Sequence, residues 1–184
     1  MKKLLLTLLL PLSIISSASY GEEINSLFGI TLYDNAEKHV SRNYIDSNKV
    51  KNTETLDGYF NLIVTNKIKT KSPYATKYWL TIDNDNKVHL IYGDDDGVVN
   101  LDICLQVNKD LVSRLEETNQ IDFKYWEYSY PAFKQYAHYY RNSLDSAFAI
   151  QCKEIFEDSA ALRQIYLKTS ILLEANEEFY DSGL

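Results

Sequence analysis

Two cysteines, Cys104 and Cys152, constrain the fold more than any other feature of this sequence. Cys152 follows Phe148 and Ile150 at every second position, which places it on the apolar face of a predicted strand. Cys104 belongs to a stripe of apolar residues at helical spacing, which predicts a helix from about Val98 to Thr118. A helix packed on the apolar face of that strand would bring the two sulfur atoms together. The stripe consists of Leu101, Cys104, Leu105, Leu111, Val112 and Leu115, and Asn108 interrupts it.

The first residues predict a cleavable secretory signal, residues 1–19. Lysines at positions 2 and 3 precede an apolar stretch, Leu4–Ile15, that is shorter than the roughly 20 residues needed to span a bilayer. Small side chains follow, and they favour cleavage after Ala18, Ser19 or Gly21. No cysteine near this junction offers a site for a lipid. The mature protein is therefore expected to be soluble, periplasmic or secreted, and without a stable membrane anchor.

Export changes the expected chemistry of the two cysteines. In an oxidising compartment such a pair is bridged more often than free, which favours a Cys104–Cys152 disulfide over two separate buried thiols. In the chain-entropy description, closing a loop of roughly 50 residues stabilises a fold by roughly 4 kcal/mol. The bridge would therefore be a major source of stability.

The mature chain, residues 20–184, has the length and composition of a single folded domain. The formal net charge is −7, and removal of the two signal lysines takes it to −7 − 2 = −9. Because nucleic acids and anionic lipid surfaces are also negatively charged, this excess opposes binding to either. Nucleic acid is therefore not expected as a partner.

Alternating apolar residues predict two β-hairpins and one further strand. The hairpins turn at residues 83–86 and 157–159. A short helix, Asn35–Ser41, is predicted after a capping box formed by Asp34 and Glu37. The predicted class is α+β: an antiparallel sheet of two hairpins plus an additional strand, packed against one long helix and short helices. The predicted strands are Tyr59–Val64, Tyr78–Ile82, Val88–Tyr92, Phe148–Phe156 and Gln164–Leu173.

The segment Leu27–Leu32, with the sequence Leu-Phe-Gly-Ile-Thr-Leu, precedes the capped helix, the hairpins and the cysteine-bearing helix. This order resembles small exported bacterial α/β proteins of unknown function, which open with a Phe-Gly-Ile-x-Leu-Gly run before a Ser-x-x-Glu helix start. Similar layouts occur in envelope-assembly lipoproteins and β-lactamase-inhibitor-like domains. The resemblance implies a binding or assembly role and transfers no catalytic residue. Tyr33 stands where glycine is usual, which leaves a tight turn there in question.

The segment from Phe123 to Tyr140 is unusually aromatic, since every second residue on average carries a ring, more than one element can easily bury. Pro131 and a helically spaced stripe predict that its second part is a helix; the stripe is Phe133, Tyr136, Ala137, Tyr140 and Leu144. The remaining rings combine flat apolar bodies with polar tips, which suits stacking on a ligand or partner protein. Packing of these rings over a sheet is the alternative. The candidate binding residues are Tyr125, Trp126, Tyr128, Tyr130 and Tyr139.

The sequence lacks the motifs Gly-x-Ser-x-Gly, His-Glu-x-x-His and Cys-x-x-Cys and has no glycine-rich phosphate loop, so no catalytic residue, metal or cofactor is predicted. The acidic runs 83–85 and 94–96 are interpreted as a turn and as favourable charge at the start of the long helix. The histidines His39, His89 and His138 are interpreted as structural.

Three functions remain open. The first is an exported binding module for an unknown extracytoplasmic protein or small ligand. The second is a hydrolase with a diffuse site of Asp94–Asp96, His89 and tyrosines, which would require a cleft that joins them. The third is an inhibitor or assembly factor of the cell envelope that docks through an exposed sheet.

Overall fold

The computed structural model describes residues 24–51, 58–95, 97, 99–129, 133–142, 146–156 and 159–168. The predicted signal peptide, Tyr130, Pro131 and Leu144 lie outside these residues. Among the described helices, none is both long and apolar enough to cross a membrane.

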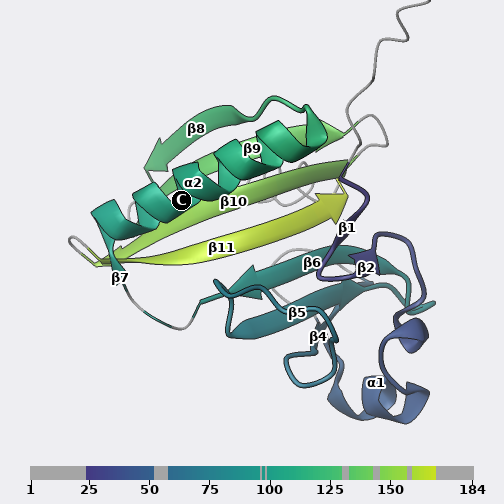
Figure 1. The fold of residues 1–184 in the computed structure, drawn as a ribbon. Helices are drawn as coiled ribbons and strands as arrows, with labels where there is room; N and C mark the ends of the chain where they lie inside the picture. The colour runs from purple at the N-terminus through teal and green to yellow at the C-terminus, as the bar shows by residue number, and fades with distance from the viewer. Residues whose placement is uncertain are drawn as a thin grey trace, which may run out of the picture.

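A nine-stranded antiparallel sheet and one long helix, α2 (Leu101–Asn119), dominate the described fold (Figure 1). The strand order is β3-β4-β5-β6-β11-β10-β9-β8, and β7 pairs with the far end of β11. The α+β class and the packing of the sheet on one long helix are confirmed, but the sheet is larger than two hairpins and one strand. The strands are β3 (Val50–Lys51), β4 (Phe60–Ile63), β5 (Lys77–Ile82), β6 (Val88–Asp94), β7 (Val99–Asn100), β8 (Lys124–Ser129), β9 (Lys134–Asn142), β10 (Ser146–Phe156) and β11 (Ser159–Lys168).

Helix α2 lies across β9, β10 and β11 and is joined to β10 by the Cys104–Cys152 disulfide, with a Cα–Cα distance of 6.0 Å (Figure 1). The predicted helix and bridge are therefore both present. Asn108, the polar interruption of the stripe, is buried, and its side-chain amide donates to the carbonyl oxygen of Ile150 over 3.0 Å. A buried amide is tolerated in this stripe because it is hydrogen-bonded.

Asp94 and Asp95 do not lie at the start of α2, which corrects their interpretation as helix-start charges, and Asp96 lies outside the described residues. The helix begins at Leu101, after β7, and Asn100 caps it by accepting a hydrogen bond from the backbone N–H of Asp102. The side chain of Asp95 instead accepts from the backbone N–H of Gly97 over 3.0 Å.

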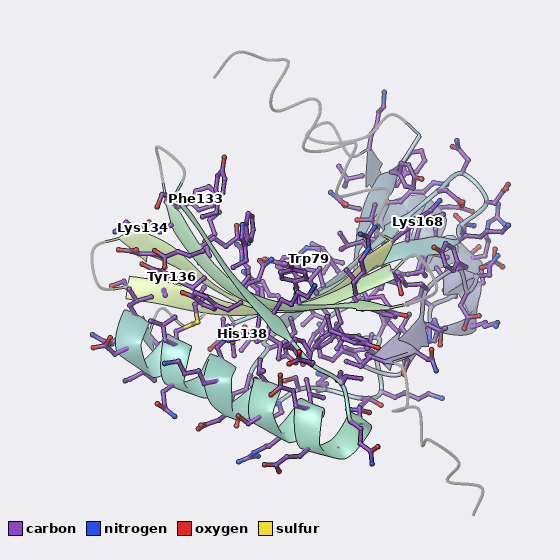
Figure 2. The ribbon with its side chains drawn as sticks, turned by 90° about the horizontal axis from the view of Figure 1, so that it is seen from above. Trp79, Phe133, Lys134, Tyr136, His138 and Lys168 are labelled. Carbon is purple, nitrogen blue, oxygen red and sulfur yellow. A yellow bond between two sulfur atoms is a disulfide. The ribbon has the colours of Figure 1, made fainter. Side chains whose placement is uncertain are left out.

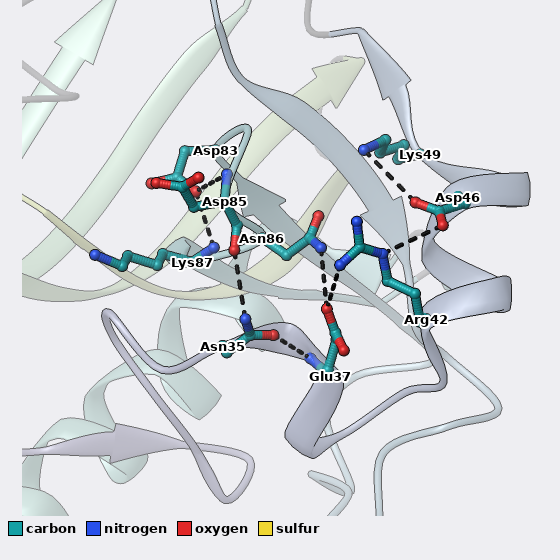
Figure 3. Close-up of polar contacts among 9 residues, drawn as sticks. All are labelled: Asn35, Glu37, Arg42, Asp46, Lys49, Asp83, Asp85, Asn86 and Lys87. Atoms are coloured by element: carbon teal, nitrogen blue, oxygen red, sulfur yellow. Dashed lines mark hydrogen bonds and ion pairs between the residues drawn. The ribbon is translucent and has the colours of Figure 1, made fainter.

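The β5–β6 hairpin is confirmed, and its turn is held by Asp83, whose carboxylate accepts from the backbone N–H groups of Asp85 and Lys87, each over 2.9 Å. The preceding short helix differs from the prediction: η1 (Ala36–Lys38) is a 3-10 turn capped by Asn35. Asp34 pairs with Lys38 instead of capping. Figure 3 shows η1 joined to the hairpin turn through Asn86, whose amide donates to Glu37.

A second short helix, α1 (Arg42–Asn48), was not predicted. Ser41 caps it, and Arg42 pairs with both Glu37 and Asp46 (Figure 3). The sequence signal was present, since a serine precedes a pair of opposite charges four residues apart. Only Ile45 of this helix is buried, so its apolar periodicity is too short to reveal it.

The strands β1 (Ser26–Leu27) and β2 (Ile30–Thr31) form a small separate hairpin whose two turn residues, Phe28 and Gly29, have φ values of 56° and 74°. The chain also turns at Tyr33, which has a φ value of 66°. The tight turn left in question therefore forms, with a tyrosine in the left-handed region.

The predicted helix over Phe133–Leu144 is wrong, because residues 134–142 form strand β9, paired with β8 and β10. Tyr136 and Tyr140 satisfy both a helical and an alternating pattern, and aromatic residues favour strands.

The β10–β11 hairpin was predicted, but its second strand begins at Ser159 rather than at Gln164.

Candidate recognition face

The sheet has two faces with different environments. We call the face that bears Cys152 and His138, both of which contact α2, the inner face, and the opposite one the outer face. On the β4–β6 half, the β1–β2 hairpin covers the inner face, because Phe28 packs edge-on against Tyr78 with ring centroids 4.7 Å apart. The outer face is not covered by any of the helices and strands whose contacts the structure describes.

Strand register places a row of apolar and aromatic residues, which ends in Lys124, across the outer face. Its large side chains stand near the two ends, and a small one, Ala149, lies on β10 between them. The large side chains toward the two ends are exposed or half-buried, whereas Ala149 and Ile165 between them are buried. From β4 to β8, the row is Ile63, Trp79, Tyr92, Ile165, Ala149, Tyr139 and Lys124.

The tryptophans of the chain, Trp79 and Trp126, both lie on this face, and each is paired with a tyrosine. Trp79 lies 5.2 Å from Tyr92, and Trp126 lies 5.3 Å from Tyr128, between ring centroids. Five strand spacings of about 4.8 Å separate the two tryptophan-bearing strands, or about 24 Å along the sheet. Figure 2 shows Trp79 and Phe133 on the side of the sheet away from α2, and His138 on the α2 side.

The outer face is basic although the whole chain is acidic. Among the described residues, strand register places one carboxylate on this face, that of Asp94, which lies 3.7 Å from Arg163. Lys153 lies over the ring of Phe133 at 4.0 Å, and Arg163 over that of Tyr92 at 5.5 Å. Basic side chains are thus interleaved with aromatic rings on this face. The basic residues that the register places on this face are Lys77, Lys124, Arg141, Lys153 and Arg163.

The structure brings together three of the five predicted binding residues. Trp126 and Tyr128 on β8 and Tyr139 on β9 lie on the outer face, and 42% of Trp126 is exposed. Tyr125 alternates with Trp126 and points to the inner face, where its ring lies 5.1 Å from that of His138. Tyr125 therefore does not share a surface with the others, and Tyr130 lies outside the described residues.

Tyr125 lines a different feature, a pocket of about 290 Å³ between α2 and β8–β9. At its polar centre, a chain of two hydrogen bonds, here called the relay, runs through the side chain of Asn108. The amide nitrogen of Asn108 donates to the backbone carbonyl of Ile150, so the amide oxygen of Asn108 is left to accept from Nδ1 of His138, over 2.7 Å. Burial lowers the pKa of His138, which favours the neutral ring with its proton on Nδ1. This relay joins α2 to the sheet and supports the interpretation of His138 as structural.

The predicted hydrolase residues are not brought to one site. His89 is buried between the rings of Tyr33 and Tyr59, and its Nε2 lies 2.8 Å from the carboxylate of Asp83. Asp94 lies five residues further along β6, about 17 Å at the usual rise. It accepts from the hydroxyl of Tyr92 over 3.2 Å. The described residues also hold no group of three side chains suited to a metal ion.

Sequence reasoning missed the half of the outer face that lies on β4–β6. The alternation that predicts the strand Val88–Tyr92 implies one shared face for Val88, Leu90 and Tyr92, but the register shifts between Thr81 and Ile82. This bulge leaves Val88 buried and turns Leu90 and Tyr92 to the opposite face. Trp79 was recognisable, because it stands out of phase with the apolar alternation of its own strand.

Comparison of the chain with protein-family models, with curated proteins and with solved structures finds no match.

Proposed function

We propose that this protein is an extracytoplasmic binding module, without catalysis, that binds an acidic segment of a partner protein across its outer face. The proposal rests on two tryptophan–tyrosine pairs with interleaved basic side chains, on a face that none of the described helices covers, in an acidic protein. The predicted signal peptide and the Cys104–Cys152 disulfide both favour an oxidising compartment.

Aromatic residues suit this role for an energetic reason. Their rings supply large contact area with few rotatable bonds, and truncation of one at a binding centre commonly costs about 2 kcal/mol or more of affinity. The basic residues around them would attract an acidic partner and set its orientation. Interleaving of the two kinds of side chain favours a segment in which carboxylates and apolar side chains also alternate.

Charge argues against a second copy of this chain as the occupant. In a two-fold dimer the same surface meets itself, so two faces with the same excess of basic side chains would repel each other. A neutral sugar could stack on the rings but would leave the basic residues without a role. An inhibitor or assembly factor is the second candidate, since docking through the exposed rings of this face would suit it.

Intrinsic fluorescence tests the proposal directly, because both tryptophans of the chain lie on the outer face. The probe is a synthetic peptide of alternating Glu with Leu or Phe, and the matched control has Lys in place of Glu. We expect the acidic peptide to change the emission saturably and the basic peptide to leave it unchanged. Equal responses to the two peptides, or no response to either, would contradict the proposal.

Two charge reversals locate the contact. Lys124→Glu changes an exposed residue on the outer face, whereas Lys109→Glu changes an exposed residue on α2, on the other side of the sheet. The net charge falls by the same amount in both variants. We expect Lys124→Glu to weaken the acidic peptide about tenfold and Lys109→Glu to weaken it less than about twofold. An equal loss in both would indicate unspecific attraction instead.

A further inference from the structure

A second pocket lies among the elements that cover the inner face, so it is on the side of the sheet opposite to the outer face. The β1–β2 hairpin, η1 and the segment after β4 enclose a pocket of about 300 Å³. Phe28, Ile30 and Ile68 form its apolar part. Its polar lining comes from Lys38, His39, Lys67, Lys69 and Thr70.

No carboxylate is among the residues that line this pocket, although the chain is acidic. The charge of Lys38 is balanced by Asp34, whose carboxylate oxygen lies 2.6 Å from Nζ of Lys38. Lys67 lies over the ring of Tyr44 at 4.9 Å, and neither Lys67 nor Lys69 pairs with a carboxylate of the described residues. The pocket therefore has an excess of positive charge at its rim above an apolar floor.

One group in the pocket points to hydrogen bonding with a ligand. Nε2 of His39 is buried and has no hydrogen-bond partner in the part of the chain that the structure describes. A buried ring nitrogen without a partner is unfavourable, and a ligand atom could satisfy it. The side chain of Thr70 lies close over Gly29, where an added Cβ would stand 3.2 Å from its hydroxyl oxygen.

We propose that this pocket binds a small organic phosphate, with the phosphate group held by Lys67, Lys69 and Thr70 and the apolar part against Phe28 and Ile68. Lysines are common phosphate ligands, and a dianion uses more than one of them. His39 supplies a further polar contact at the boundary between the two parts. The pocket volume of about 300 Å³ is at the lower limit for small-molecule sites, which restricts the ligand to a compact molecule.

The site is independent of the proposed outer-face function, because its residues lie on other elements. Its test is a heteronuclear NMR titration of the full mature protein with phenyl phosphate, inorganic phosphate, phenylacetate and phenol. We expect saturable shifts at Gly29, His39 and Thr70 with phenyl phosphate, and weaker ones with inorganic phosphate. Phenol should leave these signals unchanged. Phenylacetate shows whether the pocket prefers phosphate or binds any anion. If phenylacetate binds as tightly as phenyl phosphate, the assignment to phosphate is overturned.

Neighbouring lysines provide a matched pair of variants. Lys69 lines the pocket, whereas Lys71, also exposed and two residues away, does not. We expect Lys69→Glu to weaken phenyl phosphate at least about tenfold and Lys71→Glu to weaken it less than about twofold. Thr70→Val, which removes only the hydroxyl, should weaken it several-fold without loss of folding. Equal effects of the two lysine variants, or shifts spread over surface lysines in general, would overturn the proposal.

Discussion

The contact between Phe28 and Gly93 shows how one residue pair fixes the position of the β1–β2 hairpin. A Cβ added to Gly93 would stand 2.5 Å from the ring of Phe28, which also packs edge-on against Tyr78. Gly93 is therefore needed because any side chain there would collide with the ring of Phe28, and not because its backbone adopts a conformation that favours glycine. No sequence pattern signals this requirement, because Phe28 and Gly93 lie far apart along the chain.

We therefore predict that Gly93→Ala destabilises the protein by about 1–3 kcal/mol through overpacking. Urea unfolding of the purified protein measures the change. Gly97→Ala is the control, since its added Cβ would meet only the end of the Asp95 side chain, at 3.3 Å. Phe28→Leu in the Gly93→Ala background should recover part of the loss. A Gly93→Ala variant as stable as the Gly97→Ala variant would show that the ring adjusts without cost.

Two partly buried histidines, His39 and His138, predict how stability varies with pH. Burial lowers the pKa of His39 and of His138 in the folded protein. As the pH falls, these histidines are protonated at a higher pH in the unfolded chain, where their pKa is about 6.5, than in the folded protein. Stability is therefore greatest above this pH and falls as the pH drops through and below it. Asp83 acts in the same direction but in a more acidic range, because burial, which raises its pKa, is outweighed by hydrogen bonds that lower it.

We expect the melting temperature to fall between about pH 7.5 and 5.5. In a His39→Gln/His138→Gln variant the decrease over this range should be smaller. Thermal unfolding followed by circular dichroism measures both. If the two proteins show the same pH dependence, other groups are responsible for it.

The long helix and the strand β9 show at the level of elements what the sequence can and cannot predict. The stripe of α2 has helical spacing only, so helix and bridge were both predictable. The residues of β9 fit two periods, and only pairing with β8 and β10 selects the strand. The choice between helix and strand depends on pairing with other strands, and the spacing of residues within one segment does not contain this information.

The disulfide should contribute a large share of the stability of the α2 contact. Removal of both cysteines, as Cys104→Ala/Cys152→Ala, is expected to cost roughly 4 kcal/mol in the chain-entropy description, measured by urea unfolding. Mass spectrometry of the unreduced mature protein should show a deficit of two hydrogens. Two thiols that alkylate without a reductant would contradict the bridge.

The extent of the sheet is a property of the whole molecule. β6 pairs with β11, which joins residues 90–94 to residues 163–167, and this pairing merges the two predicted hairpins into one sheet. Each hairpin is local and was predictable, whereas the pairing between them is not encoded in any short window. The outer face exists only as a result of this merger. For the same reason, the sequence indicated the rings of β8 and β9 but not their continuation through Tyr92 and Trp79.

The most direct test of the central claim is the affinity of a partner, once captured from the native envelope fraction, for variants on the two faces of β8. Trp126→Ala/Tyr128→Ala removes one ring pair of the outer face, and Tyr125→Ala removes a ring from the inner face of the same strand. We predict at least about tenfold weaker binding for the double variant, about 1.4 kcal/mol, with an unchanged melting temperature. Tyr125→Ala should retain the affinity. Unchanged binding by the double variant, or its unfolding, would show that these rings serve the structure and not recognition.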